Sequence, residues 1–362
     1  MGIRIEFVSL ELKDFVKFGG MQTFVFARPP AAGASALTVA TGAGGSGKTC
    51  LITALRLALW GVGRLWLPDG KHVVGRWAPA DAFAKPDLYF NAAALAGETP
   101  QAFVRLTLRV ARPRGASTTL QVTRTLAVGD DGRVMEGLNV TTNAAGRTSH
   151  LVGAAAQRRV SRLLPPARLP LVFADCEMFE YLGVLAARDA RRRLAARRYV
   201  QLLTGGGCPV EWWLEVAPTI IAFANRLLAC GVDDDLRLLT DAEGREWPGA
   251  YEVCPGTWVS RDPDSPVALG CIGSAVALGL HLAGGARVPF VLDAPALRIP
   301  PEHAAIYFEA LSGFAGSQVV ITAHECQVDE LAMHLWGRAH RIYLVEDRRD
   351  ACTALLSEPV LW

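Results

Sequence analysis

Apolar and polar residues alternate along two segments in the N-terminal half of the chain, 103–110 and 120–128, and two further segments there are rich in strand-forming residues. Such a period of two predicts half-buried β-strands, because successive side chains of a strand point to opposite faces. The predicted strands are residues 3–8, 23–26, 103–110 and 120–128. Glycine-containing turns are expected at Phe18-Gly19-Gly20, between the first two strands, and at Gly129-Asp130-Asp131-Gly132 after the fourth. Residues 62–98 show no regular pattern.

Helical patterns dominate the second half, where they alternate with short apolar strands. The expected helices are residues 154–165, 184–203, 211–230, 267–283 and 301–313. The expected strands are Val288–Asp293, Gln318–Thr322 and a pair around 341–356. Strands that alternate with helices in this way favour parallel βαβ units. Residues 231–265 are rich in Asp, Gly and Pro and are expected to form hairpins and loops.

A glycine-rich loop joins the apolar strand at 37–41 to a helix that runs to about Leu59 and stops at Gly61. The loop, Gly42–Thr49, is a complete Walker A element in the strand–loop–helix context that this motif requires. Its backbone N–H groups and the helix N-terminus suit a polyphosphate, Lys48 suits the β- and γ-phosphates, and the Thr49 hydroxyl suits Mg²⁺. A plain glycine turn would not explain Lys and Thr at this offset, so we expect a nucleoside triphosphate. The expected binding residues are Gly42, Ala43, Gly44, Gly45, Ser46, Gly47, Lys48, Thr49 and Cys50.

A second acidic strand should supply a carboxylate to the metal ion. Asp293, which ends an apolar run, is the best candidate, so Thr49 and Asp293 are the expected metal ligands. The alternative is that Asp293 only caps a turn at the strand end. Asp293 lies far downstream of Lys48, unlike in compact GTPases and small kinases, and the chain has no Asn-Lys-x-Asp guanine motif. The nucleotide site is therefore assembled from the two ends of the chain.

Composition is that of a folded protein with a large core, since 51% of the 362 residues are hydrophobic and 20% are charged. A net charge of +2 means that nucleic-acid affinity would have to come from a local patch. The eight cysteines form no Cys-x-x-Cys pair, as expected for reduced thiols rather than for disulfides or zinc ligands. No signal-like segment is seen and the apolar stretch 266–283 is too broken to span a membrane, so a cytoplasmic or nucleoid-associated protein without membrane contact is expected.

Arginines cover much of one predicted helix near 188–198. They are Arg188, Arg191, Arg192, Arg193, Arg197 and Arg198. Such a run usually covers a solvated helix face. The alternative, which would be a function, is binding of the phosphate backbone of DNA. The sequence leaves both open.

Several motifs, taken in order, resemble those of SMC-like ABC ATPase heads, a group that includes SbcC, RecF and the DndD ATPase of DNA sulfur modification. The N-terminal match is Leu10-Glu11-Leu12-Lys13-Asp14-Phe15 followed by the Walker A loop. Val172–Phe179 resembles the Phe-Phe-Asp-Gly-Glu-Lys-Ile signature of DndD-type heads at the Q-loop position, Phe290–Pro295 resembles their Walker B strand, and Ile321–Glu325 resembles the segment with their switch histidine.

The resemblance implies an α/β P-loop NTPase of the ABC/SMC-head type, with a mixed central sheet, an antiparallel β subdomain and an inserted helical lobe. The implied parts are an ATPase lobe at 1–150, an insert at 151–265 and a second ATPase lobe at 266–362. It also implies ATP with Mg²⁺ as the ligand, and catalytic roles for Asp175 and His324. Asp175 could instead be an exposed loop acid, and His324 a structural histidine.

Departures from the family pattern all concern hydrolysis or assembly. The chain has no sustained heptads for a long coiled coil, and the best match to the signature loop, Val267–Cys271, lacks the serine that would reach a partner's γ-phosphate. Ala294 stands where most ABC ATPases carry a water-orienting carboxylate, and the D-loop aspartate falls at Pro300 or Pro301. Because phosphoryl transfer depends on positioning and charge stabilisation, nucleotide binding should outlast turnover.

These features favour a slow ATPase head that acts as a nucleotide-gated clamp or scaffold in DNA transactions such as modification, repair or antiviral defence. The alternative is a structural subunit that binds nucleotide without hydrolysing it. An ABC transporter ATPase is disfavoured by the wide Walker spacing. The expected partners are DNA and either another ABC-type head or a different subunit, since two identical chains would each present a weak signature loop.

Overall fold

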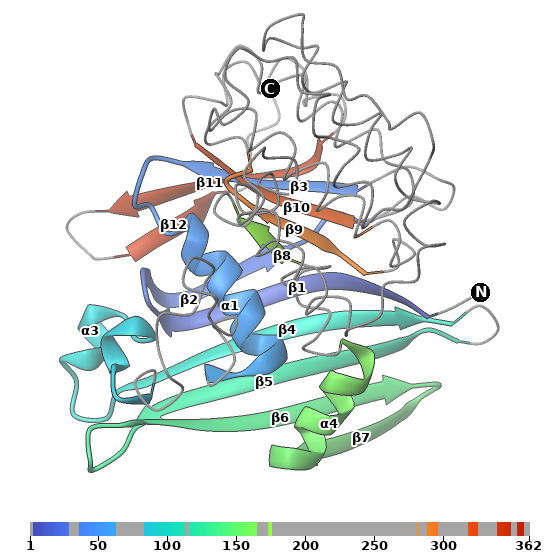
Figure 1. Ribbon diagram of the computed structural model, residues 1–362, viewed down its shortest axis with the longest axis horizontal. Coiled ribbons are helices and arrows are strands. Elements are labelled where there is room, and N and C mark those ends of the chain that lie inside the picture. Colours follow the sequence, from blue (N-terminus) through green and yellow to red (C-terminus); the bar gives the residue numbers. More distant parts are fainter. Residues whose placement is uncertain are drawn as a thin grey trace, which may run out of the picture.

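The computed structural model describes residues 3–28, 36–62, 83–112, 116–164, 173–175, 281, 288–295, 318–324, 339–348 and 353–357. For 173–175, 339–340, 347–348 and 353–357 it describes the backbone alone. Two six-stranded sheets and the helix α1 (Lys48–Trp60) make up most of this part of the chain (Figure 1).

The first sheet is antiparallel throughout, in the order β2-β1-β4-β5-β6-β7. Its strands are β1 (Arg4–Phe15), β2 (Phe18–Val25), β4 (Gln101–Ala111), β5 (Thr118–Val128), β6 (Val134–Ala144) and β7 (Arg147–Val152). Buried and more exposed side chains alternate along β4 and β5, so one face of this sheet lines the core. The helix α4 (Gly153–Leu163) follows β7 and covers the same face as α1 (Figure 1).

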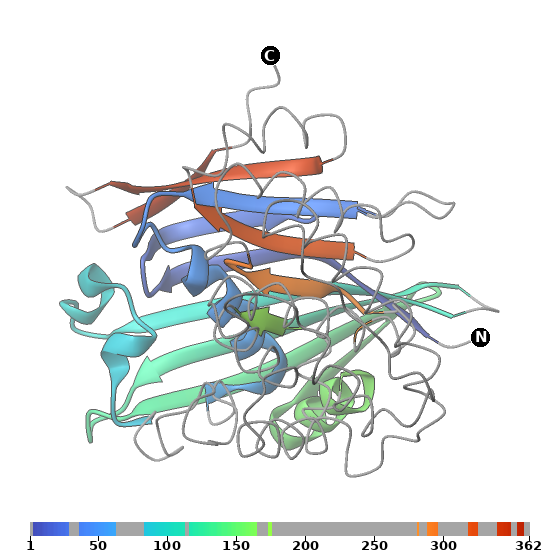
Figure 2. The same cartoon turned by 45° about the horizontal axis from the view of Figure 1, so that its top comes forward.

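The second sheet has the order β12-β11-β3-β10-β9-β8 and is parallel except at β12. Its strands are β3 (Ala36–Gly42), β8 (Phe173–Asp175), β9 (Phe290–Asp293), β10 (Gln318–His324), β11 (Ala339–Arg348) and β12 (Thr353–Ser357). Every residue of β3 is buried, as expected for a central strand of a parallel sheet. The sheet combines strands from both ends of the chain, which Figure 2 shows as blue and orange-red strands side by side.

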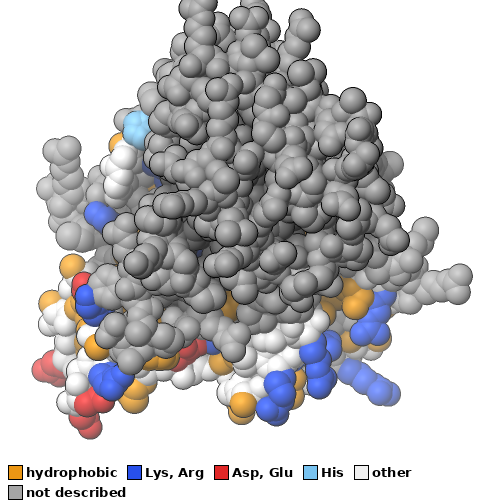
Figure 3. Space-filling view, in the orientation of Figure 1, with side chains coloured by type: hydrophobic (Ala, Val, Ile, Leu, Met, Phe, Trp, Pro, Cys, Tyr) orange, Lys and Arg blue, Asp and Glu red, His pale blue; other side chains and the backbone are white. Residues whose placement is uncertain are grey.

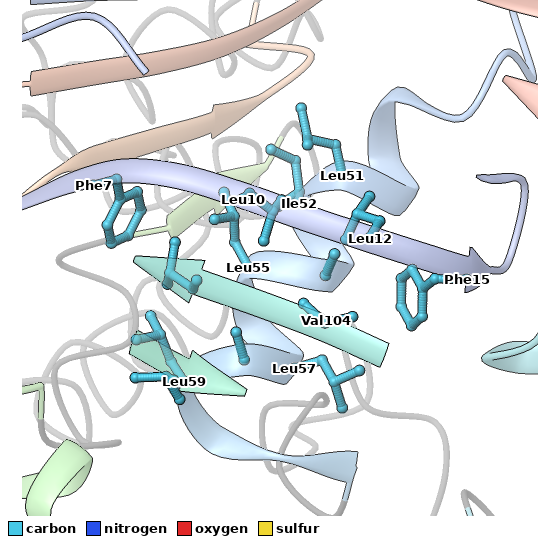
Figure 4. Close-up of a cluster of buried hydrophobic side chains, with 14 of the residues drawn as sticks. Phe7, Leu10, Leu12, Phe15, Leu51, Ile52, Leu55, Leu57, Leu59 and Val104 are labelled. Carbon is cyan, nitrogen blue, oxygen red and sulfur yellow. The ribbon is translucent and has the colours of Figure 1, made fainter. Parts of the chain in front are cut away.

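Helix α1 packs against both sheets through one continuous core. Leu51, Ile52, Leu55, Leu57 and Leu59 of α1 are fully or almost fully buried against apolar side chains of β1 and β4 (Figure 4). The same cluster includes residues of β9, β10 and β11 in the second sheet. The helix that follows the glycine loop therefore lies at the centre of the hydrophobic core.

Two buried polar side chains of the second sheet hydrogen-bond to backbone groups at the edge of the first. Gln318 accepts from the Phe7 N–H (2.7 Å) and donates to the carbonyl oxygens of Phe7 (2.8 Å) and Ala27 (2.7 Å). The Tyr343 hydroxyl accepts from the Val25 N–H (2.9 Å) and donates to the Val25 carbonyl (2.7 Å). Because buried polar atoms must be paired, these bonds fix how the two sheets dock.

The predicted strands and the parallel arrangement of the C-terminal strands are confirmed, but the first turn was misplaced. Gly19 and Gly20 lie inside β2, and the chain reverses at Val16 and Lys17 instead. This turn has no glycine of its own, and Val16 adopts a positive φ of 49°. Contacts from a distant segment support it, because Val16 donates to the Tyr89 carbonyl (3.2 Å) and accepts from the Asn91 side chain (3.1 Å).

Four further elements were not predicted from the sequence pattern. Strands β6 and β7 extend the antiparallel sheet, and the stretch from 62 to 98 contains the short helices η2 (Pro86–Leu88) and α3 (Ala92–Leu95). The predicted helix at 154–165 is confirmed as α4. The predicted helices at 184–203, 211–230, 267–283 (except His281) and 301–313 lie outside the described residues, as does the loop region 231–265. No helix in the described ranges is long and apolar enough to cross a membrane.

Candidate nucleotide-binding site

The glycine loop leaves β3 at its C-terminal end and enters α1 at Lys48. Ala43, Gly44 and Gly45 are exposed to solvent, while Ser46 and Gly47 are buried beneath them. Gly47 precedes the helix with a φ of 110°, and no side chain caps the first turn of α1. The N–H groups of that turn therefore have no side-chain acceptor, which is the arrangement that favours an anion at a helix N-terminus.

Gly42 cannot be replaced without moving the neighbouring strand. Its φ is 153°, and a Cβ atom built on it would lie 2.2 Å from the Val345 carbonyl oxygen and 2.9 Å from Ser46 Oγ. Gly45 has a φ of 79°, a conformation that L side chains rarely adopt. The glycines of the motif thus meet backbone requirements that are visible in this structure.

Lys48 folds back over the loop. Its Nζ donates to the carbonyl oxygens of Gly42 (2.7 Å) and Ala43 (2.6 Å) and lies 3.4 Å from Ser46 Oγ. The ammonium group is thereby held at the mouth of the loop, on the side where the exposed residues 43–45 lie. A phosphate in the loop would offer it charged oxygens in exchange for these carbonyl contacts.

Two hydroxyl groups converge on the carboxylate of Asp293 at the end of β9. Thr49 Oγ1 lies 3.4 Å from Asp293 Oδ1, and Thr322 Oγ1 donates to the same oxygen at 2.6 Å. Thr322 is fully buried, and its hydroxyl also accepts the Ala294 N–H at 2.8 Å. Thr322 therefore fixes both the carboxylate and the start of the next segment, where Ala294 has a positive φ of 47°.

This donor set suits a hard divalent cation. Mg²⁺ prefers oxygen ligands and is commonly bound by one or two protein groups plus substrate phosphates. Thr49 and Asp293 provide a hydroxyl and a carboxylate beside the phosphate loop. Within the described ranges no group of three or more His, Cys, Asp and Glu side chains could form a metal cage by itself. The residues present therefore fit Mg²⁺ that is shared with a nucleotide.

His324 ends β10 in register with Gly42 of β3. A Cβ atom built on Gly44 would lie 3.8 Å from His324 Nε2, so the imidazole borders the exposed part of the loop. Asp175 ends β8, and its backbone pairs with that of Asp293. All these positions lie at the same edge of the sheet, because parallel strands end on one side.

Cys50 sits one residue after Thr49 and is half-buried. Burial raises the pKa of its thiol above the ordinary value; the Lys17 backbone and charge oppose this rise, and the charge of Asp293 adds to it. The thiol is therefore protonated at neutral pH and behaves as a small packing group.

The far end of α1 holds a buried charged group that the sequence analysis did not single out. Arg124 of β5 donates to the carbonyl oxygens of Ala58 (3.0 Å) and Leu59 (3.4 Å), which are the last carbonyls of α1, and pairs with Glu136. Gln157 of α4 donates to Leu59 (3.2 Å) and accepts from Arg124. Burial lowers the pKa of Arg124, and Glu136 counteracts this effect. A cation at a helix C-terminus is electrostatically favourable.

Several predicted site residues lie outside the residues that the structure describes. They are the signature-loop candidate Val267–Cys271, the prolines at 300 and 301, and the six arginines Arg188, Arg191, Arg192, Arg193, Arg197 and Arg198.

Thr322 was missed because a threonine within an apolar strand looks like any other β-branched residue. The signal that could have found it is its position two residues before His324, at the end of a strand beside the glycine loop.

Comparison with known proteins assigns the fold. The family described as "AAA domain" matches residues 9–182, slightly less than half of the 362-residue chain. A solved SMC head bound to the C-winged helix domain of ScpA has a TM-score of 0.50 at 14% identity, with 98% of each chain covered. This chain has the fold of an SMC-like ABC ATPase head. The α/β P-loop NTPase architecture with an antiparallel and a mixed sheet is therefore confirmed.

Two further SMC head structures give slightly lower TM-scores. The SMC head domain from Thermotoga maritima gives a TM-score of 0.47 at 14% identity, covering 98% of this chain and 100% of that chain. An Smc head with an extended coiled coil, bound to the C-terminal domain of ScpA and derived from Pyrococcus furiosus, gives 0.49 at 13%, covering 98% and 96%. No curated protein matches the sequence.

Proposed function

We propose that this chain binds ATP with Mg²⁺ and acts as a nucleotide-gated head in DNA transactions. Nucleotide binding is supported by one observation above all: Lys48, Thr49 and Asp293 lie together at one edge of the second sheet. Asp293 comes more than two hundred residues after the loop, so the fold itself brings these side chains together. The SMC-like fold supports the same ligand. The division into lobes at 1–150, 151–265 and 266–362 remains part of this proposal.

Each residue has a definite task in this proposal. The loop 42–47 surrounds the phosphates with backbone N–H groups, and Lys48 exchanges the carbonyls of Gly42 and Ala43 for phosphate oxygens. Thr49 and Asp293 hold the cation, which supplies charge neutralisation at the phosphates when bound. His324 borders Gly44 and is suited to contact the terminal phosphate.

Hydrolysis should be slow. The methyl group of Ala294 cannot accept a hydrogen bond from an attacking water, and phosphoryl transfer needs the nucleophile to be positioned. A purely structural, nucleotide-binding subunit is the second candidate, and Ala294 is the observation that favours it. Turnover separates the two: the ATPase head should turn over measurably but well below the enzyme median of about 10 per second.

The biological role rests on resemblance. The Asp175 and Walker B segments resemble those of DndD-type heads, which supports a role in DNA modification, repair or antiviral defence. The structural relatives bound to ScpA domains are heads that bind another protein. For this chain we likewise propose a protein partner, either a second head or a different subunit, whose association ATP tightens.

A thermal-shift experiment tests the nucleotide site. ATP with Mg²⁺ should stabilise the full chain by mass action, by about 2.7 kcal/mol at a hundredfold excess over Kd. Lys48→Ala should abolish this shift, while Lys13→Ala, which removes an exposed lysine of β1, should leave it unchanged. An equal shift in wild type and in Lys48→Ala would show that ATP does not bind in this loop.

A further inference from the structure

Helix α4 carries a row of arginines on the side that faces away from the core. Its apolar residues Ala156 and Val160 are buried against the first sheet. Arg158 and Arg162 are exposed, and Arg159 between them is half-buried. Residues four apart lie one above the other on a helix, with Cβ atoms about 5–6 Å apart. We call Arg158, Arg159 and Arg162 the α4 arginine surface.

Several arginines of the first sheet form ion pairs with acidic residues of the same sheet. Arg105 pairs with Glu11, Arg109 with Glu6, and Arg124 with Glu136. In contrast, no described acidic residue forms an ion pair with the α4 arginine surface. The sequence from 137 to 164 contains four arginines and one histidine but no Asp or Glu.

The charge is also separated in space. In Figure 3 a group of Lys and Arg side chains without Asp or Glu lies at the lower right, over the region that Figure 1 gives to α4 and β7, whereas Asp and Glu side chains lie farther left, together with other Lys and Arg side chains. Arg147 of β7, the strand that precedes this helix, is exposed and adds to the positive side. A surface of one sign, without internal ion pairs, attracts a polyanion.

The fold excludes binding to a membrane surface, which is a common function of a basic amphipathic helix. A helix that lies on a membrane must insert its apolar side into the lipid. The apolar side of α4 is instead consumed by packing on the sheet, with Val160 only 1% exposed. What remains outside is a row of planar, multidentate guanidinium groups, the side chain best suited to phosphate.

We infer that the α4 arginine surface binds the phosphate backbone of duplex nucleic acid. This inference rests on the proposed role in DNA transactions and assigns that role to residues distinct from the arginines at 188–198. Arg158 and Arg162 each neutralise a phosphate, and Arg159 supports them from the same turn. The contact is with the backbone, so binding is independent of base sequence.

Salt-dependent binding of the full-length protein tests this surface. The probe is a fluorescein-labelled 30-base-pair duplex, measured by anisotropy over a range of salt concentrations. Each lost phosphate contact should lower the slope of log K against log salt by about 0.9, so Arg158→Gln/Arg162→Gln should lower it by about two. At 0.1 M salt this corresponds to a loss of affinity on the order of tens of fold.

Two controls make the result specific. Lys13→Gln/Arg133→Gln removes the same charge from exposed positions on β1 and on the β5–β6 turn, and should leave the slope unchanged. Arg158→Lys/Arg162→Lys keeps the charge and should retain most of the slope. Thermal unfolding confirms that each variant is folded before binding is compared.

Three outcomes would overturn the inference in different ways. If wild type and Arg158→Gln/Arg162→Gln bind alike, the DNA role stands but this surface is wrong. If wild type does not bind the duplex while its ATP-dependent thermal shift is intact, the DNA role itself fails and nucleotide binding survives. If polyglutamate of equal charge displaces the duplex completely, the surface recognises acidic protein rather than nucleic acid.

Discussion

The hydroxyl of Thr322 should control how well the cation binds, and its removal is the sharpest test of the site. Thr322→Val keeps the shape of the side chain and deletes Oγ1. This removes the 2.6 Å bond to Asp293 Oδ1 and leaves the Ala294 N–H without its acceptor. Hydrogen bonds to charged groups contribute about 1.5–3 kcal/mol, so folding stability should fall by roughly that amount.

The effect on the ligand should be similar in free energy to the effect on the fold, since a tenfold change in affinity is about 1.4 kcal/mol. Groups that orient a metal-binding carboxylate typically contribute about 10–100-fold to metal affinity. We therefore expect Thr322→Val to weaken ATP binding in the presence of Mg²⁺ by about tenfold or more, with little change when Mg²⁺ is chelated. Thr322→Ser, which restores the hydroxyl, should recover most of the Mg²⁺-dependent affinity.

Thr38→Val is the matched control for this experiment. Thr38 lies in β3, is 2% exposed, and its hydroxyl likewise accepts a backbone N–H, that of Ala27 at 2.9 Å. Its replacement should destabilise the fold to a similar degree but leave the Mg²⁺ dependence of ATP binding unaltered. The affinities are measured by titration calorimetry with and without Mg²⁺. Equal Mg²⁺ dependence in wild type and Thr322→Val would refute the role of Thr322 in orienting Asp293 for the cation.

Two further predictions concern the interior of the head. Arg124→Met should destabilise the fold by about 3–5 kcal/mol, because Glu136 would be left without its partner, whereas Arg124→Met/Glu136→Gln should recover part of this loss; denaturant unfolding measures both. The pKa of the Cys50 thiol is raised by burial, so its neutral form stabilises the fold below the ordinary thiol pKa, and this contribution is lost as the pH rises through the raised value. Alkylation of the Cys50 peptide, followed by mass spectrometry, should accordingly rise at higher pH than that of a free cysteine, and a midpoint at or below the ordinary value would contradict the burial.

The sequence predicted the parts of the site that depend on local patterns. The Walker A loop requires glycines and a Lys-Thr pair at fixed offsets, and β9 and β10 are apolar runs that end in polar residues. The register between these strands could not be predicted from local patterns. That His324 lies opposite Gly42, and Asp175 opposite Asp293, depends on pairings between segments far apart in the chain. Those pairings are set by the packing of the two sheets on α1, which no local pattern encodes.

The errors also have physical causes. Gly19 and Gly20 resemble a turn, but at the actual reversal Val16 donates to the Tyr89 carbonyl and accepts from the Asn91 side chain, 75 residues away. Strand β6 was missed because Glu136 occupies an inward-facing position. A charged residue there contradicts the apolar pattern of a strand unless its partner, Arg124, is known to lie on the neighbouring strand.

Helix α1 connects the proposed nucleotide site to the helix that carries the α4 arginine surface. Its first residues, Lys48 and Thr49, belong to the nucleotide site, and its last carbonyls are held by Arg124 and by Gln157 of α4. The Trp60 indole adds a hydrogen bond to the Leu164 carbonyl at the end of α4 (3.0 Å). A helix of 13 residues is about 20 Å long and behaves as a rigid element because its core face is fully packed. Through α1, the phosphate loop at one end and the helix that carries the α4 arginine surface at the other are therefore joined by packed side chains and direct hydrogen bonds.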